Sequence, residues 1–305
     1  IPRPVEQIRD EIVAMSNQGI SFFRFSCSDT PIGHGGAIAQ MLLDEGIKVN
    51  YSMFFRSGKV SEQSFQTLCM MIKSGLRAVY IGGETGHDEI LHKVMNKGLA
   101  SADIMNTVLS VKRASQEVGL PCQVALSFIY PCPVVPDVSL QDIFDADIEL
   151  IRKTMPDTVI INPPAVMPGT TWADRHETFG FRLGKGYYKK LMSYEYSLYK
   201  PYDFWRSQIE YGLNNLDVLG ILRETARLSS AVEQMGIPLN IPDELMMMAQ
   251  AIGFKAGDLR DFKTNTMVDV MTGTGDYLRQ VTRTINDYSR QMAETSRDTR
   301  NKKLA

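Results

Sequence analysis

Strand-like and helix-like segments alternate through the first 160 residues, and this alternation constrains the fold more than any other feature of the chain. Short runs rich in branched and aromatic residues stand at 20–26, 47–55, 76–82, 122–130 and 158–162. Between these runs, apolar residues recur at steps of three and four, as they do on one face of a helix. Strands joined by single helices form right-handed βαβ units with a parallel sheet. We therefore predict an α/β fold with five parallel strands, three units short of a complete eightfold barrel.

The strand signals stop at about residue 185. Beyond this point the apolar pattern predicts helices over 205–235, 243–253 and 276–300. The Met246–Met248 run is expected to pack a helix interface rather than to bind a ligand. The sequence therefore predicts two domains, a barrel-like region over residues 1–184 and an all-helical C-terminal region over residues 185–305.

Composition excludes several classes of protein. Lys and Arg together number 33 against 35 Asp and Glu, so no net positive field exists to hold nucleic acid or an anionic membrane. No apolar run approaches the roughly 20 residues that cross a bilayer, and no signal peptide is visible. The four cysteines are too scattered for a disulfide framework, so a cytoplasmic location is expected. The chain opens with Ile in a helical pattern, which suggests that an upstream part is missing.

Chemistry in parallel barrels concentrates in the loops at the carboxyl ends of the strands. The third such loop contains Gly82, Gly83 and Glu84, where a carboxylate can accept bonds from ribose hydroxyls or pair with an ammonium group. A tight turn with Glu84 bonded to backbone amides explains the same residues equally well. Arg56 ends the second strand, and either a ligand carboxylate or a buried ion pair accounts for it. Asp29 is expected to cap a turn.

Two further sets of residues are not expected to carry chemistry. His34 stands in a glycine-rich segment, 32–36, that we expect to be a solvated loop. The spacing of the cysteines Cys27, Cys69, Cys122 and Cys132 is not that of a metal site, and no metal ligand is assigned.

Three segments together resemble the radical S-adenosylmethionine (SAM) enzymes. YIGGETGHDEILHKVMNKG at 80–98 looks like the fourth-strand motif of that family, which leads into an MNKG sequence. RPVEQIRDEI at 3–12 is similar to the helix after the cluster loop, and VMPGTTWADRHETFG at 166–180 is similar to the sixth-strand segment. The likeness spans residues 3 to about 182 and is closest to the subclass that often carries an upstream cobalamin-binding domain.

The resemblance implies a partial (βα)6 TIM-like barrel whose first strand and CxxxCxxC loop precede Ile1. It also implies SAM and a 4Fe-4S cluster as cofactors of the full-length protein, cobalamin as a candidate third, and an electron donor such as flavodoxin or ferredoxin. The substrate would be a small molecule or peptide, and the reaction reductive cleavage of SAM or methyl transfer. The implied cofactor-binding residues are Arg56, Gly82, Gly83, Glu84, Ser127, Pro168 and Gly169.

The chain departs from the family pattern in three ways. The family's second strand often ends in an acidic pair, whereas Ser26-Cys27-Ser28-Asp29 stands here, and Tyr130-Pro131-Cys132-Pro133 replaces the usual fifth-strand turn. The ligand cysteines are also absent, so this chain alone is expected to bind no cluster and to be inactive. Two alternatives remain open: a degenerate, non-catalytic barrel that binds a nucleotide-like ligand or a partner, and an ordinary barrel lyase.

Overall fold

A sheet of parallel strands forms the centre of the computed structural model, which describes residues 2–26, 29–191 and 210–304. Within these ranges, five strands lie side by side in sequence order, and each neighbouring pair is parallel. The predicted parallel α/β sheet is confirmed. Its strands are β1 (Phe22–Phe25), β2 (Asn50–Phe55), β3 (Leu76–Glu84), β4 (Gln123–Ile129) and β5 (Thr158–Asn162).

Side chains along these strands alternate between the two faces of the sheet, and both faces are covered. Tyr51, Val79 and Leu126 belong to the main core on the outer face. Ala78 and Ala125 belong to a second cluster on the inner face. Burial on both faces explains why the strands read as nearly continuous apolar runs.

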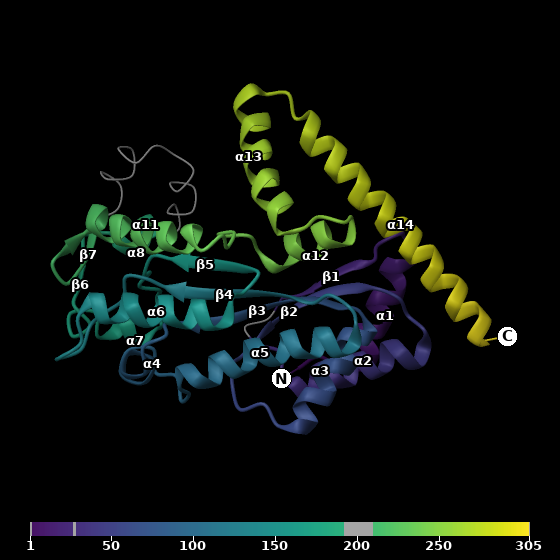
Figure 1. Ribbon diagram of the computed structural model, residues 1–305, viewed down its shortest axis with the longest axis horizontal. Coiled ribbons are helices and arrows are strands. Elements are labelled where there is room, and N and C mark those ends of the chain that lie inside the picture. Colours follow the sequence, from purple (N-terminus) through teal and green to yellow (C-terminus); the bar gives the residue numbers. More distant parts are fainter. Residues whose placement is uncertain (1, 27–28, 192–209, 305) are drawn as a thin grey trace.

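The helices that connect the strands cover the outer face (Figure 1). Ser61 caps one of them by accepting a bond from the Ser64 amide, and Ser139 forms the predicted capping box with Asp142. The helices are α1 (Val5–Ser16), α2 (Ile32–Glu45), α3 (Glu62–Ser74), the short α4 (Asp88–Lys93), α5 (Ser101–Val118) and α6 (Leu140–Thr154).

The glycine-rich segment 32–36 is the first turn of α2, so the predicted loop there is wrong. A Cβ on Gly35 would lie 2.7 Å from Cε of Met71. The glycines therefore let α2 and α3 approach closely. His34 consequently lies on a helix rather than in a solvated loop.

The β/α rhythm continues past β5 through helix α11 (Val218–Gln234). After α11 the chain returns to the sheet, and Leu239 forms a parallel bridge with Val159 of β5. The Val159 amide donates to the Pro238 carbonyl at 3.1 Å, and Asn240 donates back to Val159 at 2.9 Å. Sequence analysis placed no strand here, because the pairing is short and includes a proline without an amide hydrogen.

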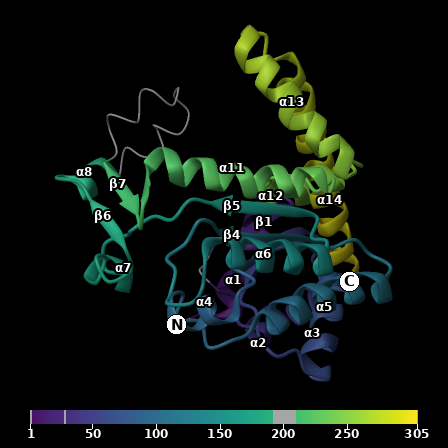
Figure 2. The ribbon, with the colours of Figure 1, turned by 60° about the vertical axis from the view of Figure 1, so that its left-hand side comes forward.

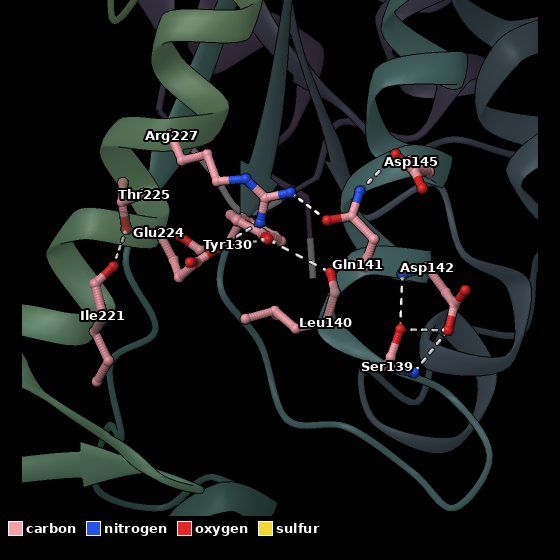
Figure 3. A network of polar contacts seen from close by, with 10 residues as sticks. All are labelled: Tyr130, Ser139, Leu140, Gln141, Asp142, Asp145, Ile221, Glu224, Thr225 and Arg227. Atoms are coloured by element: carbon pink, nitrogen blue, oxygen red, sulfur yellow. Dashed lines mark hydrogen bonds and ion pairs between the residues drawn. The ribbon is translucent and has the colours of Figure 1, made fainter.

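A polar network fastens α11 to α6 and to the end of β4 (Figure 3). The Tyr130 hydroxyl donates to Oε2 of Glu224 at 3.0 Å, and Thr225 donates to the Tyr130 carbonyl at 2.8 Å. Arg227 donates to both Glu224 and Gln141, which links the two helices directly. Helix α6 is therefore held from two sides, by the sheet and by α11.

Helix α12 (Asp243–Ala251) crosses the inner face of the sheet, where it contacts β1 to β4. Met246 and Met247 are buried against Ala78 and Ala125 of the strands. The small residues on β3 and β4 leave room for these long side chains. The expectation that the methionines pack a helix interface is confirmed.

The C-terminal region is mainly helical, as predicted, but it is not entirely helical. Residues predicted as part of a helix over 205–235 form β7 (Tyr211–Leu213) and β8 (Leu216–Asp217), while 192–209 lie outside the described residues. Both strands join an antiparallel sheet with β6 (Phe181–Leu183). The three β7 residues are buried, and pairing with β6 satisfies their backbone. Two short helices flank this sheet, α7 (Thr171–Asp174) and α8 (Tyr187–Leu191).

The last two helices form a hairpin whose tip projects beyond the sheet, as Figure 2 shows, and the second of these helices returns to contact α1 and α12. They are α13 (Ala256–Thr272), which sequence analysis missed, and α14 (Asp276–Leu304). Ser289 of α14 accepts a bond from the Ser21 amide at 2.9 Å, which ties the hairpin to the start of β1. No helix in the described ranges has the length and apolar character of a membrane span. The division at residue 184 stays a prediction, and the β6–β7 pairing crosses it.

Candidate functional site

A cavity of about 610 Å³ lies at the carboxyl ends of β2 to β5. Helix α12 covers the inner face of the sheet nearer the amino ends of the strands, so it closes this face below the cavity. Ligands of parallel α/β folds bind at this end of the sheet. The polar and aromatic residues that line the cavity include Asp29, Phe54, Arg56, Tyr80, Gly82, Glu84, Lys97, Ser127, Asn162 and Trp172.

An ion pair between Glu84 and Lys97 stands in this cavity. Nζ of Lys97 lies 2.8 Å from Oε1 of Glu84, and the two side chains are 18% and 23% exposed, respectively. The same Nζ donates to the Gly82 carbonyl at 2.9 Å. The Glu84 carboxylate therefore faces the cavity and pairs with a cation. This arrangement differs from the alternative interpretation, in which Glu84 bonds the backbone amides of a tight turn.

Two glycines before Glu84 make room for this arrangement. A Cβ on Gly82 would lie 2.9 Å from Oε1 of Glu84 and 3.2 Å from Nζ of Lys97. Gly83 does not line the cavity; a Cβ there would lie 3.0 Å from the Ser127 carbonyl of β4. The register between β3 and β4 shifts at this point, so the chain bulges and Glu84 adopts a φ of 63°.

Tyr80 lies between the ion pair and the inner core. Burial raises the pKa of its hydroxyl, and side-chain hydrogen bonds with Ser127 and Asn162 act in the opposite direction. Its ring packs against Phe54 with centroids 4.6 Å apart. Ser127 therefore lines the cavity from β4, beside a tyrosine and an amide, and the cofactor-binding role that the resemblance implies for it stays a prediction.

Arg56 directly follows the end of β2 and also lines the cavity. Its backbone amide donates to Oδ1 of Asp29, 27 residues earlier in the chain, at 3.2 Å, so this bond joins two loops; the cap expected at the Thr30-Pro31 turn stays a prediction. Asp29 also borders a second cavity, of about 640 Å³, between α1, β1 and the start of α2, where His34 lies. The two cavities therefore meet at Asp29.

Pro168 and Gly169 lie beside the cavity rather than in its lining. They are exposed, and Gly169 adopts a φ of 79° in the turn before α7. Their neighbours Met167 and Trp172 supply the wall instead. The Trp172 indole donates to the Val94 carbonyl at 3.1 Å, which ties this segment to the stretch before Lys97.

The described residues contain no group of three or more His, Cys, Asp or Glu that could hold a metal. Cys122 precedes β4 and Cys132 follows it, so the seven residues of the strand separate the two thiols. Burial raises the pKa of both thiols, which opposes formation of the thiolates that bind metals. Cys27 lies outside the described residues.

Sequence reasoning assigned no role to four side chains that line the cavity. Lys97 stands in the MNKG motif, which was recognised without assigning a function to its lysine. Tyr80, two residues before Gly82, shares its face of β3, and Asn162 ends a predicted strand; alternation along the strands could have found both. Trp172 reaches the cavity through a loop, and no periodic signal predicts such a position.

Comparisons with known proteins leave the family open. No protein-family model and no curated protein matches the chain. Two structures of the cobalamin-dependent S-adenosylmethionine radical enzyme OxsB, one with aqua-cobalamin and one with aqua-cobalamin and SAM, are 12% and 15% identical, each with a TM-score of 0.43. They cover 97% of this chain, which spans 43% and 42% of their lengths.

A lyase gives a weaker likeness. The trigonal structure of 2,3-dimethylmalate lyase, a PEP mutase/isocitrate lyase superfamily member, is 10% identical over 90% of this chain and 82% of its own, with a TM-score of 0.33. At these scores neither likeness carries a conclusion about activity.

Proposed function

We propose that the cavity binds SAM and that the chain is the SAM-binding catalytic region of a radical SAM enzyme, an oxidoreductase or methyltransferase, within a longer protein. The observation that carries this proposal is the convergence of Arg56, Gly82, Glu84 and Ser127 on one cavity. These residues come from three different strands. The resemblance to radical SAM enzymes implies a contact with the same ligand for all four residues.

The chemistry of the cavity fits the parts of this ligand. SAM carries an ammonium group, a carboxylate, two ribose hydroxyls and a flat adenine. Glu84 can pair with the ammonium group or accept from the ribose, and Arg56 and Lys97 supply cations for the carboxylate. Tyr80 and Trp172 offer aromatic surface to the adenine. The volume of about 610 Å³ lies within the roughly 300–1,000 Å³ range of small-molecule sites.

The residues of this chain would bind and orient the ligand. Because Glu84 is already paired with Lys97, an incoming ammonium group shares or replaces that partner, and the released lysine can meet the ligand carboxylate. A 4Fe-4S cluster and SAM, when bound, supply one-electron chemistry to the site. The cluster, cobalamin and an electron donor such as flavodoxin or ferredoxin belong to the whole protein in this proposal, and no described residue is assigned to them.

The test is a titration of SAM into the full-length, cluster-loaded protein and its Glu84→Gln variant. Glutamine keeps the shape and can still accept from Lys97, but it removes the charge. A charge-assisted bond is about 1 kcal/mol or more stronger than a neutral one, so we expect SAM affinity to fall about five- to tenfold. Glu89→Gln is the matched control, because Glu89 pairs with Lys93 at 2.6 Å on α4 and does not line the cavity.

Unchanged SAM affinity in Glu84→Gln, or an equal loss in Glu89→Gln, would contradict the assignment of the cavity. Thermal melts of both variants check that folding is unaffected. Formation of 5′-deoxyadenosine by the reduced full-length protein then separates an enzyme from a non-catalytic barrel that binds the same ligand.

Lys97 makes a barrel lyase the second candidate, since a lysine amine in a barrel mouth can form a Schiff base. This role is the less favoured one, because Nζ of Lys97 is already engaged by the Glu84 carboxylate and the Gly82 carbonyl. Borohydride reduction in the presence of pyruvate distinguishes the two. A covalent adduct on Lys97 would favour the lyase.

A further inference from the structure

The turn that follows Glu84 is fastened to helix α6 by one buried carboxylate. Oδ1 of Asp147 accepts a hydrogen bond from the Thr85 hydroxyl at 2.7 Å and another from the Gly86 amide at 2.6 Å. The Asp147 side chain has no solvent exposure. Asp147 therefore joins the loop at the cavity to a helix that is 61 residues further along the chain.

Burial of a carboxylate at this position is unfavourable for the free energy of folding. Its second oxygen, Oδ2, has no hydrogen-bond partner among the described residues, and burial raises the pKa of the group to about 7. The side chains near it that titrate, Cys132 and Tyr130, are neutral, because burial raises the pKa of each. Burial, Gly86 and Thr85 are the influences on its pKa, and no cation among the described residues pairs with it, so burial of the Asp147 charge costs folding free energy that a neutral acceptor would not cost.

The residues that Asp147 holds are the two that directly follow Glu84. Glu84 adopts a φ of 63°, which costs a non-glycine residue energy and persists where the surroundings enforce it. The Thr85 amide donates to the Gly83 carbonyl at 2.8 Å, which tightens the same turn. A Cβ on Gly86 would lie 2.3 Å from the Ala146 carbonyl, so the loop lies directly against α6.

We infer that Asp147 is a positioning residue of the cavity: by holding Thr85 and Gly86 against α6, it fixes the strained turn that aims Glu84 at Lys97 and at the ligand. The part of this inference that concerns the ligand rests on the proposed function. The part that concerns the turn stands on the geometry. Helix α6 suits this role because the Tyr130–Glu224–Arg227–Gln141 network of Figure 3 anchors it to α11.

The experiment compares Asp147→Asn, which keeps the acceptor, with Asp147→Leu, which removes it. Thr85→Val is a milder variant that removes one of the two donors and covers the case in which Asp147→Leu does not fold. Asp157→Leu is the matched control. Asp157 is a partly buried acid that also accepts a backbone amide, from Val124 at 2.8 Å, but it lies at the amino end of the sheet.

Hydrogen–deuterium exchange of the ligand-free, full-length protein tests the turn. We expect amides of residues 84–87 to exchange at least about tenfold faster in Asp147→Leu and measurably faster in Thr85→Val. They should exchange at nearly the wild-type rate in Asp147→Asn and in Asp157→Leu. Equal exchange in all variants would overturn the inference, whatever the ligand is.

Titration with SAM tests the positioning of Glu84. We expect Asp147→Leu to weaken binding about tenfold, Asp147→Asn to stay within about threefold of wild type, and Asp157→Leu to bind normally despite a lower melting temperature. In the Glu84→Gln background, Asp147→Leu should add less than about twofold, since both changes act through one side chain. If Asp147→Leu weakened SAM binding by the full factor of about ten in the Glu84→Gln background as well, the role of Asp147 would be merely structural and the inference would be overturned. Failure of the wild type to bind SAM would instead refute the proposed function, and the exchange result would then decide the inference.

Discussion

Asp147→Asn should flatten the pH dependence of stability. Burial, the largest cause, raises the pKa of Asp147 from its ordinary 3.8 to about 7. The unfolded chain releases this proton near pH 4, whereas the folded protein keeps it until near pH 7. The unfolded state therefore binds fewer protons in that window, and unfolding free energy falls as pH rises through it. The stabilising contribution is complete below about pH 4 and lost above about pH 7.

The magnitude follows from the two pKa values of Asp147. Their difference corresponds to about 4 kcal/mol of unfolding free energy, at about 1.4 kcal/mol per pH unit. Between pH 5 and pH 8 the wild type should lose about 3 kcal/mol relative to the asparagine variant. The asparagine of the variant keeps Oδ1 as an acceptor for Thr85 and Gly86 but cannot ionise. The unfolding free energy of the variant should therefore not change with pH through this position.

Urea unfolding of wild type and variant at pH 5, 6, 7 and 8 measures this difference. Asp142→Asn is a useful control, because hydrogen bonds from Ser139 lower the pKa of this capping carboxylate. The stabilising contribution of the Asp142 carboxylate is present above its unfolded pKa and is lost as pH falls. The difference in unfolding free energy between wild type and Asp142→Asn should therefore stay constant from pH 5 to pH 8. Parallel curves for wild type and Asp147→Asn would refute the reasoning, since they would mean that Asp147 titrates at its ordinary pKa.

Three other outcomes are expected. Gly86→Ala should lower the free energy of unfolding by about 3 kcal/mol, because the new Cβ would meet a backbone oxygen that no rotamer change can move. An unchanged midpoint in urea unfolding would contradict this close approach. Met246→Ala should cost about 3 kcal/mol through the cavity it leaves under the site, whereas Met271→Ala, at a position that is 80% exposed, should change stability little. Anaerobic reconstitution of the 305-residue chain with iron and sulfide should give no cluster absorbance, and a stoichiometric cluster would show that the cysteines had been misjudged.

Periodicity determines the parts of this fold that depend on neighbours in sequence. The five strands, the helices between them and the caps at Ser61 and Ser139 all follow from side-chain patterns within windows of a few residues. The parallel arrangement follows as well, because single helices between strands leave few topologies open. For the same reason, residues near the carboxyl ends of parallel strands, such as Arg56, Glu84 and Ser127, come together at one edge of the sheet.

Tertiary structure decides what meets at that edge. The Glu84–Lys97 pair joins residues 13 positions apart across a helix and a loop, and no short window contains its geometry. The buried link from Asp147 to Gly86 depends on how α6 packs against a bulge in β3. The hairpin at 211–217 exists because β6 offers it a partner. These contacts draw their energy from burial and from hydrogen bonds between distant segments, which local propensity does not contain.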